Sequence, residues 1–316
     1  MAYKFEPDES VRHALTRCAR EQLDRSVSEL SDGIGTDPVE AIHSARKAIK
    51  KERSLLRLVR GAMPREQRRR ENAALREVGR SLSGARDAEV MIASIDELSD
   101  RFAGQLPETA FQRIREHLEA RRSAAAELGN CSVVDKRVVQ HLAAVRARVD
   151  EWQLRGGGWK SLESGLLRSY ERGRQTFGRA RVSSEMEDLH SWRKRVKDLW
   201  YHERLLAQIC GPTVRGHAKE LDLLSDLLGD DHDLALLRHE LTQTTTPATA
   251  GVDAVVNLID HRRSELQTEA TRLGERVYAE TVKAYRRRMR RSWTVGRGLA
   301  RAPLDENPRQ LAAATR

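Results

Sequence analysis

The 316-residue sequence has few of the residues that staple small folds, bind zinc or span membranes. Its three cysteines are isolated and form no CxxC pair, so neither a disulfide framework nor a zinc site is predicted. No apolar run approaches the roughly 20 residues that cross a bilayer. The first ten residues, MAYKFEPDES, contain no apolar signal-peptide core. We therefore expect a soluble, cytoplasmic protein without a membrane span.

Proline and β-branched runs are also scarce. Most of the eight prolines open or precede a stretch rich in Ala, Leu, Arg and Glu, and proline is tolerated in the first turn of a helix. Between them, apolar residues recur every three or four positions, which predicts an all-α protein. The expected helices cover residues 9–31, 38–62, 65–83, 86–103, 107–128, 134–153, 160–181, 185–210, 213–229, 232–243 and 248–295.

Two octapeptides reveal an internal repeat. HSARKAIK occupies residues 43–50 and HSWRKRVK occupies residues 190–197, and LSGARD at 82–87 resembles LGDDHD at 228–233. A repeat of this length indicates duplication of a helical bundle. We predict two similar bundles, 8–154 and 159–295, related by an approximate two-fold. The glycine run 155–158 would join them, and the tail 296–316 is expected to be disordered.

The net charge of +10 suits a polyanionic partner. At 100° per residue, the cations of each octapeptide and of the helix after it share one face. Stacked like charges repel by a few tenths of a kcal/mol per pair, so a repeated stripe indicates a function beyond a solvated surface. The predicted binding residues are His43, Arg46, Lys47, Lys50 and Arg57 in the first copy and His190, Arg193, Lys194, Lys197 and Arg204 in the second.

The two histidines allow two interpretations. His43 and His190 each stand near the start of a helix, where the dipole disfavours a further cation. Each could pack against the bundle as a structural residue, or it could donate a hydrogen bond to a phosphate oxygen. Both interpretations stay open from the sequence.

The repeated pair of motifs, H-x-x-R-K-x-x-K followed by L-[SG]-x-x-[RH]-D, resembles the CHAD domain (conserved histidine α-helical domain). The resemblance covers residues 8–295. It implies two bundles in pseudo-two-fold symmetry around a basic cleft or pore, binding of inorganic polyphosphate without catalysis or a cofactor, and association with polyphosphate granules. It also implies that Asp87 and Asp233 are structural and orient the basic residues.

Further candidates are less well matched between the halves. Arg53 corresponds to Trp200 in the second copy, and Arg76 and Arg80 align with Asp222 and Asp226, so we expect unequal contributions from the halves. The remaining candidates follow the helix faces without a matched repeat, and these are Arg20, Arg172, Arg174 and Tyr201.

Two other functions compete with polyphosphate binding. A basic helical protein could bind nucleic acid nonspecifically, although aromatics for base stacking are few and no known nucleic-acid-binding motif is present. GDDHD at 229–233 is similar to the His-Asp pair of metal-dependent phosphohydrolases. In the first copy of the repeat, Arg86 occupies the position of His232, and arginine does not ligate metals. A phosphohydrolase is therefore the least favoured interpretation, and we expect no metal.

Overall fold

The computed structural model describes residues 3–82, 87–127, 136–183, 185–243 and 251–300. Within those ranges all regular structure is helical, which confirms the all-α prediction. Two short 3-10 helices, η1 (Gly33–Gly35) and η2 (Val149–Glu151), accompany the α-helices. The α-helices are α1 (Val11–Ser31), α2 (Pro38–Leu58), α3 (Arg65–Ser81), α4 (Asp87–Arg101), α5 (Glu108–Glu127), α6 (Lys136–Ala147), α7 (Trp159–Ser183), α8 (Met186–Cys210), α9 (Pro212–Gln243), α10 (Val252–Val277) and α11 (Val282–Leu299).

Helix α2 carries the first octapeptide, and the local sequence explains where this helix begins. The Asp37 side chain accepts hydrogen bonds from the backbone N–H groups of Val39 and Glu40, at 3.1 and 3.0 Å. Pro38 occupies the first helical position, where its fixed φ is favourable and its missing N–H has no partner to lose. The cap therefore fixes where the helix begins.

Two predicted helix boundaries are wrong. The break expected between 229 and 232 does not exist, because α9 continues through GDDHD. Asp231 is buried there and accepts hydrogen bonds from Arg263 and Gln267 of α10, at 3.1 and 2.8 Å, so tertiary contacts override the weak helix propensity of Gly and Asp. Conversely, the helix expected over 248–295 is divided, and Thr281 caps α11 by accepting from the Ala284 N–H.

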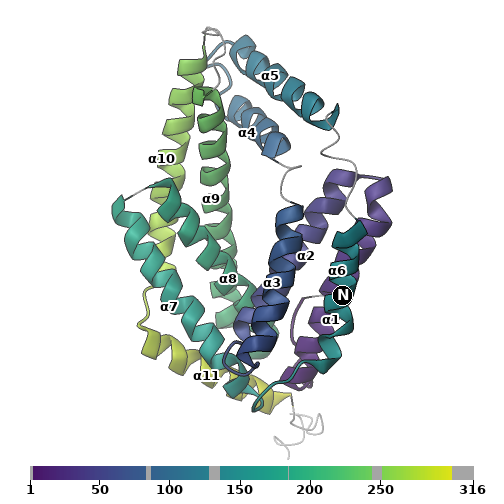
Figure 1. Cartoon of the computed structure of the whole chain (residues 1–316). Coiled ribbons are helices and arrows are strands. Elements are labelled where there is room, and N and C mark those ends of the chain that lie inside the picture. The colour runs from purple at the N-terminus through teal and green to yellow at the C-terminus, as the bar shows by residue number, and fades with distance from the viewer. Residues whose placement is uncertain (1–2, 83–86, 128–135, 184, 244–250, 301–316) are drawn as a thin grey trace, which may run out of the picture.

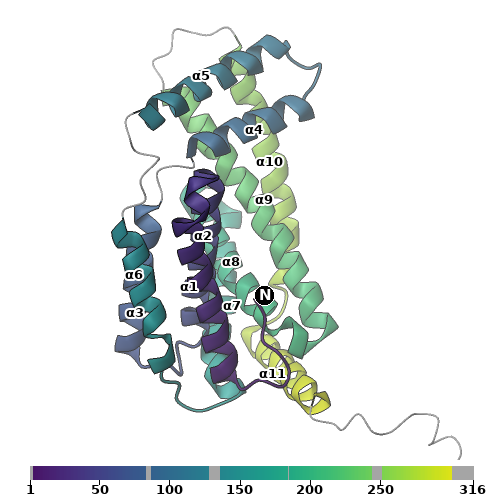
Figure 2. The same ribbon diagram turned by 90° about the vertical axis from the view of Figure 1, so that its right-hand side faces the viewer.

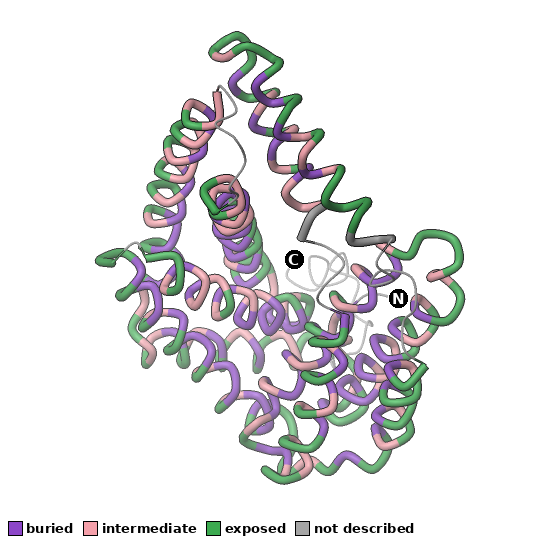
Figure 3. Tube along the Cα trace, turned by 45° about the horizontal axis from the view of Figure 1, so that its top comes forward, coloured by how far each residue is buried: buried purple, intermediate pink, exposed green. Residues whose placement is uncertain are grey.

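The two halves of the chain interlock rather than stand apart. Helices α4 and α5 of the first half lie across the long α9–α10 pair of the second half at one end of the molecule (Figures 1 and 2). At the other end, α2 packs against α7 and α8, and α3 and α6 lie outside α1 and α2. Buried positions, purple in Figure 3, occur in both halves, and the buried hydrophobic residues form one cluster with contributions from both.

A very close helix approach joins the halves. A Cβ added to Gly165 of α7 would lie 1.9 Å from the carbonyl oxygen of Leu58 at the end of α2. Nearby, His202 of α8 donates its Nε2–H to the Ser54 carbonyl of α2 at 3.0 Å. Burial lowers the pKa of His202 to about 4, so this histidine is neutral and the contact is an uncharged hydrogen bond.

An ion-pair bridge lies beside this contact. Asp198 of α8 is buried, and its carboxylate forms ion pairs with Arg57 of α2 and with Arg195 of its own helix. The N···O distance is 3.1 Å in each pair. Moving α2 away would leave this buried carboxylate with only Arg195 of its own helix, and the loss of a partner from a buried charge is costly. The bridge therefore sets the register of α2 against α8.

Substitution of Gly165 by Ala should test the close approach. The added methyl group would collide with backbone, and the free energy of unfolding should fall by about 1–3 kcal/mol or more. Gly178, in the same helix, is the matched control because a Cβ there meets nothing within 4 Å. Gly178→Ala should gain about 0.5–1 kcal/mol. Urea denaturation would measure both, and equal effects would refute the steric account.

Candidate functional site

A cleft of about 350 Å³ lies among helices α2, α8 and α9. It brings together residues that are more than 140 positions apart in the sequence, from both octapeptides. Six Lys and Arg side chains, three from α2 and three from α8, face two aspartates from α9. The lining residues are His43, Arg46, Lys47, Lys50, Arg193, Lys197, Trp200, Tyr201, Arg204, Asp222, Ser225 and Asp226.

The α2 wall consists of the four motif residues of the first octapeptide, His43, Arg46, Lys47 and Lys50. Spacings of three and four residues place them on one helical face. Arg46 also donates from Nη1 to the Leu82 carbonyl at 3.1 Å, where α3 ends and its last carbonyl groups lack helical partners. This arginine therefore holds the end of α3 close to the cleft.

The α8 wall carries Arg193, Lys197 and Arg204 together with two aromatic residues. The Arg204 guanidinium lies 5.4 Å from the centre of the Trp200 ring, a cation–π contact that orients it. Tyr201 is buried, and burial raises the pKa of its hydroxyl to about 12. Trp200 was not among the predicted binding residues, although its position one helical turn after Lys197 could have indicated it.

The α9 wall supplies Asp222, Ser225 and Asp226. Partial burial and the neighbouring Asp226 raise the pKa of the Asp222 carboxyl, although Arg204, Lys197 and Lys47 act in the opposite direction. These carboxylates face the cations across the cleft. They lower its positive potential and would repel an anion that enters it.

His190 lies apart from the cleft lining. Its ring stacks on that of His232 of α9, with centroids 4.4 Å apart and an interplanar angle of 21°. Burial, followed by Lys194 and His232, lowers the pKa of His190 to about 4. His190 is therefore a neutral packing residue between α8 and α9, whereas His43 lines the cleft.

Several predicted residues lie elsewhere and have other partners. Arg57 pairs with Asp198, Arg53 donates to Asn72 at 3.2 Å, Arg20 pairs with Asp150 and Arg174 donates to the Glu280 carbonyl. The cleft lining also does not include four exposed residues, Lys194, Arg76, Arg80 and Arg172.

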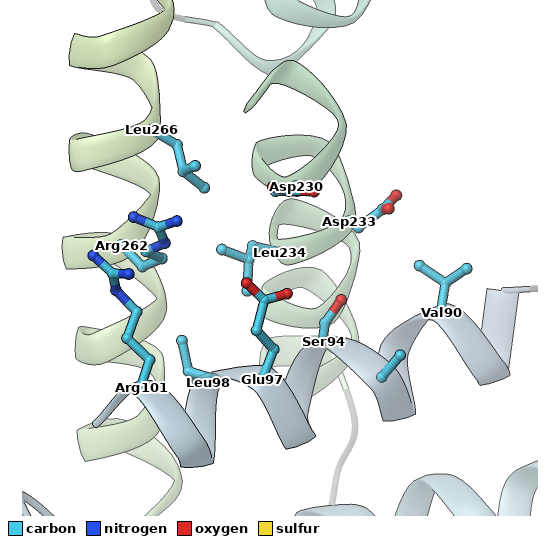
Figure 4. A pocket seen from close by; sticks show the side chains of 11 residues that line it. Val90, Ser94, Glu97, Leu98, Arg101, Asp230, Asp233, Leu234, Arg262 and Leu266 are labelled. Carbon is cyan, nitrogen blue, oxygen red and sulfur yellow. The ribbon is translucent and has the colours of Figure 1, made fainter. Parts of the chain in front are cut away.

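The two motif aspartates differ in their surroundings. Asp87 begins α4, and its side chain lies outside the described residues. Asp233 lies inside α9, so it caps no helix, and it lines a pocket of about 180 Å³ among α4, α9 and α10 with Glu97 and Asp230 (Figure 4). The buried, ion-paired aspartate of GDDHD is its neighbour Asp231. The sequence of GDDHD does not indicate which of its aspartates is buried, because burial depends on which face of α9 packs against α10.

The described part of the chain contains neither a metal-ligand cluster nor a membrane-spanning helix. Across residues 3–300, apart from the short undescribed gaps, no group of three or more His, Cys, Asp or Glu side chains is arranged to hold a metal ion. The ring of His232, the histidine of GDDHD, stacks on the ring of His190. No described helix has the length and apolarity needed to cross a bilayer.

Comparison with known proteins identifies the family. The family model of the CHAD domain matches residues 14–242, which is more than half of the chain. The protein therefore belongs to the CHAD domain family, as the repeated motifs suggested.

The individual relatives are distant. The chain is 29% identical over 265 residues to the uncharacterized protein MT2285 of Mycobacterium tuberculosis, covering 78% of this chain and 48% of that protein. It thus spans about half the length of this curated relative. The CHAD domain of Ricinus communis has a TM-score of 0.60 at 16% identity, covering 89% of this chain and 96% of that one. PptA from Streptomyces chartreusis has a TM-score of 0.60 at 14% identity, covering 86% and 100%. These structures share the fold.

Removal of the His190 imidazole should change how stability depends on pH. Between about pH 6.5 and 4 the unfolded chain would protonate this histidine while the folded chain keeps it neutral. The unfolded state then binds more protons, so stability falls as the pH falls through this window. In His190→Gln the loss of unfolding free energy across it should be smaller by about 1 kcal/mol or more. Denaturant titrations at several pH values would measure the slope, and an unchanged slope in His190→Gln would contradict this account.

Proposed function

We propose that the protein binds inorganic polyphosphate in the cleft among α2, α8 and α9, without catalysis. One observation carries the proposal: the cations of both octapeptides, far apart in sequence, line a single cleft. Confining six cations in this space costs Coulomb energy. A bound polyanion would offset that cost. A basic face that only contacts solvent would not bring the cations together and would not carry this cost.

The chemistry of the lining suits a flexible chain of phosphates. Arg46, Arg193 and Arg204 can contact phosphate oxygens with two N–H groups each, whereas Lys47, Lys50 and Lys197 act as mobile point charges. Successive phosphates would meet cations from α2 and α8 alternately. In this arrangement His43 would donate a hydrogen bond, and the cleft selects for charge density rather than for a shaped ligand.

Nucleic acid is the alternative polyanion. A cleft of about 350 Å³ is too small to enclose a duplex, which could contact only its rim. For a single strand, the base-stacking surface is limited to Trp200, because Tyr201 is buried and Arg204 already lies over the Trp200 ring. Both features favour a chain without bases.

The proposal extends to the origin of the two halves and to the location of the protein. The halves would be products of a duplication that preserved the basic face of α2 and α8 while the later helices diverged, since α9 is one helix where α3 and α4 are two. Polyphosphate binding would bring the protein to polyphosphate granules in the cytoplasm.

Charge reversal at the centre of the cleft provides the direct test. Lys47→Glu combined with Lys197→Glu should weaken the binding of long-chain polyphosphate by at least about tenfold, because two charge-assisted contacts become repulsive. Binding should also depend less steeply on salt. The control variant is Lys136→Glu with Lys283→Glu, which changes two exposed residues on α6 and α11. It alters the net charge equally and should bind polyphosphate like the wild type.

Competition at fixed salt would complete this test. Unlabelled duplex DNA should displace labelled polyphosphate poorly, and EDTA should not matter. Equal displacement by DNA would reduce the cleft to a generic cationic surface, and loss of binding with EDTA would require a metal.

The aspartates of α9 generate an independent prediction. Asp226→Asn removes one repulsive charge from the cleft while keeping its shape, so polyphosphate affinity should rise by about three- to tenfold at low salt. Isothermal titration calorimetry would measure the change. A weaker affinity would instead show that Asp226 orients the cations productively.

A further inference from the structure

A second and larger cavity, of about 980 Å³, lies at the end of the molecule where α1 and α7 begin and α11 ends. It is lined by the glycine run and by one face of α11, two sequence features that polyphosphate binding does not use. Its charged lining consists of five cations and one carboxylate, namely Arg12, Lys160, Arg286, Arg290, Arg297 and Glu163.

The glycine run borders this cavity directly before helix α7. Gly156 and Gly158 have φ values of 75° and 54°, which glycine adopts without strain. A Cβ on any of the three glycines would meet no atom within 4 Å, so the loop backbone borders open space. Gly158 has no side chain to cap the helix, and the first N–H groups of a helix lack carbonyl partners within it.

In the described part of the chain, the hydroxyl of Ser161 is an unpartnered polar group in the wall of this cavity. Ser161 lines the cavity and is fully buried, and its Oγ has no hydrogen-bond partner among the described residues. Several Ser and Thr side chains in these helices donate to the carbonyl four residues earlier, among them Thr16, Ser26, Thr176, Thr242 and Thr268, whereas Ser54 of α2 is buried without a partner within the described ranges, as Ser161 is. For Ser161 the residue four positions earlier is Gly157, which precedes the helix.

The cations of the cavity are incompletely neutralised. Arg286 forms two hydrogen bonds to Glu163, at 2.7 and 3.3 Å, and Arg297 donates to backbone carbonyls of the N-terminal segment. Lys160, Arg290 and Arg12 have no carboxylate within ion-pair distance in the described part of the chain. These three charges are available to an anion.

We propose that this cavity is a separate site for a single phosphate group, either orthophosphate or the phosphate of a small monoester. The same cavity is lined by the start of α7, with its N–H groups that lack helical partners, by the Ser161 hydroxyl and the Lys160 side chain, and by Arg290 from α11. This differs from the cleft, whose donors are side chains spread along two helices. The remaining volume has room for the organic part of a monoester beside Trp293 and Val11.

The N-terminal segment separates the two sites. The Phe5 N–H bonds the Leu205 carbonyl of α8 at 2.9 Å, and Gln208 of α8 donates to Glu6 at 2.7 Å. Arg204 of the cleft lies just before these contacts in α8, and the second cavity lies beyond them. Each site can therefore be disabled without changing the other.

Amide NMR of the full chain would test the second site. Inorganic phosphate and glycerol 3-phosphate would each be titrated into the wild type and into the Lys47→Glu, Lys197→Glu variant, whose cleft is reversed in charge. We expect saturable shifts of the Gly156–Lys160 amide signals in both backgrounds. Tighter binding of glycerol 3-phosphate would identify the monoester as the ligand class, and equal binding would identify orthophosphate.

Two substitutions and a neighbouring control complete the experiment. Arg290→Ala should weaken phosphate binding by about tenfold, whereas Arg291→Ala, exposed and outside the cavity lining, should not. Ser161→Ala should weaken binding without lowering the stability of the ligand-free protein, since its hydroxyl has no partner to lose. Shifts that do not saturate, or equal losses in Arg290→Ala and Arg291→Ala, would overturn the proposal. Retained polyphosphate binding in Arg290→Ala would show that the cleft is unaffected.

Discussion

The contact of α2 with α7 and α8 is the constraint on which the candidate site depends. Gly165 lets the backbone of α7 touch the end of α2, and the Asp198 bridge sets the register of α2 against α8. Since the octapeptides lie on these helices, the same contact places their cations on one cleft. A structure that separated the halves would keep both basic faces but lose the cleft between them.

Charge is distributed unevenly around this contact, and the unevenness has a physical basis. Cations that fall within the interface between the halves obtain carboxylate or carbonyl partners, as Arg57 does with Asp198, because an unpaired buried charge is expensive. Cations that face the cleft remain in contact with solvent and tolerate mutual repulsion at a smaller cost. The stripe predicted on each helix is therefore divided by tertiary structure into a part within the interface between the halves and a part that lines the cleft.

The two halves differ at the histidine that each octapeptide carries. His43 lines the cleft, whereas His190 stacks on His232, a residue whose counterpart by the repeat is Arg86. The two histidines differ because the environment of a helical residue depends on which helix packs over it. The α9 wall differs as well, since Asp222 and Asp226 stand where the first half has arginines.

The all-α class, the repeated motifs and the family could be predicted from sequence because helical periodicity and motif spacing are local properties. Helical spacing predicted that the motif residues of the first octapeptide share one face, and all four line one cleft wall. The continuity of α9 through GDDHD, the turn before Thr281 and the burial of Asp231 rather than Asp233 could not be predicted. Each depends on a partner more than 30 residues away or on packing that propensity does not describe. Sequence alone determined which faces are basic, and only the tertiary structure decided which of those charges meet.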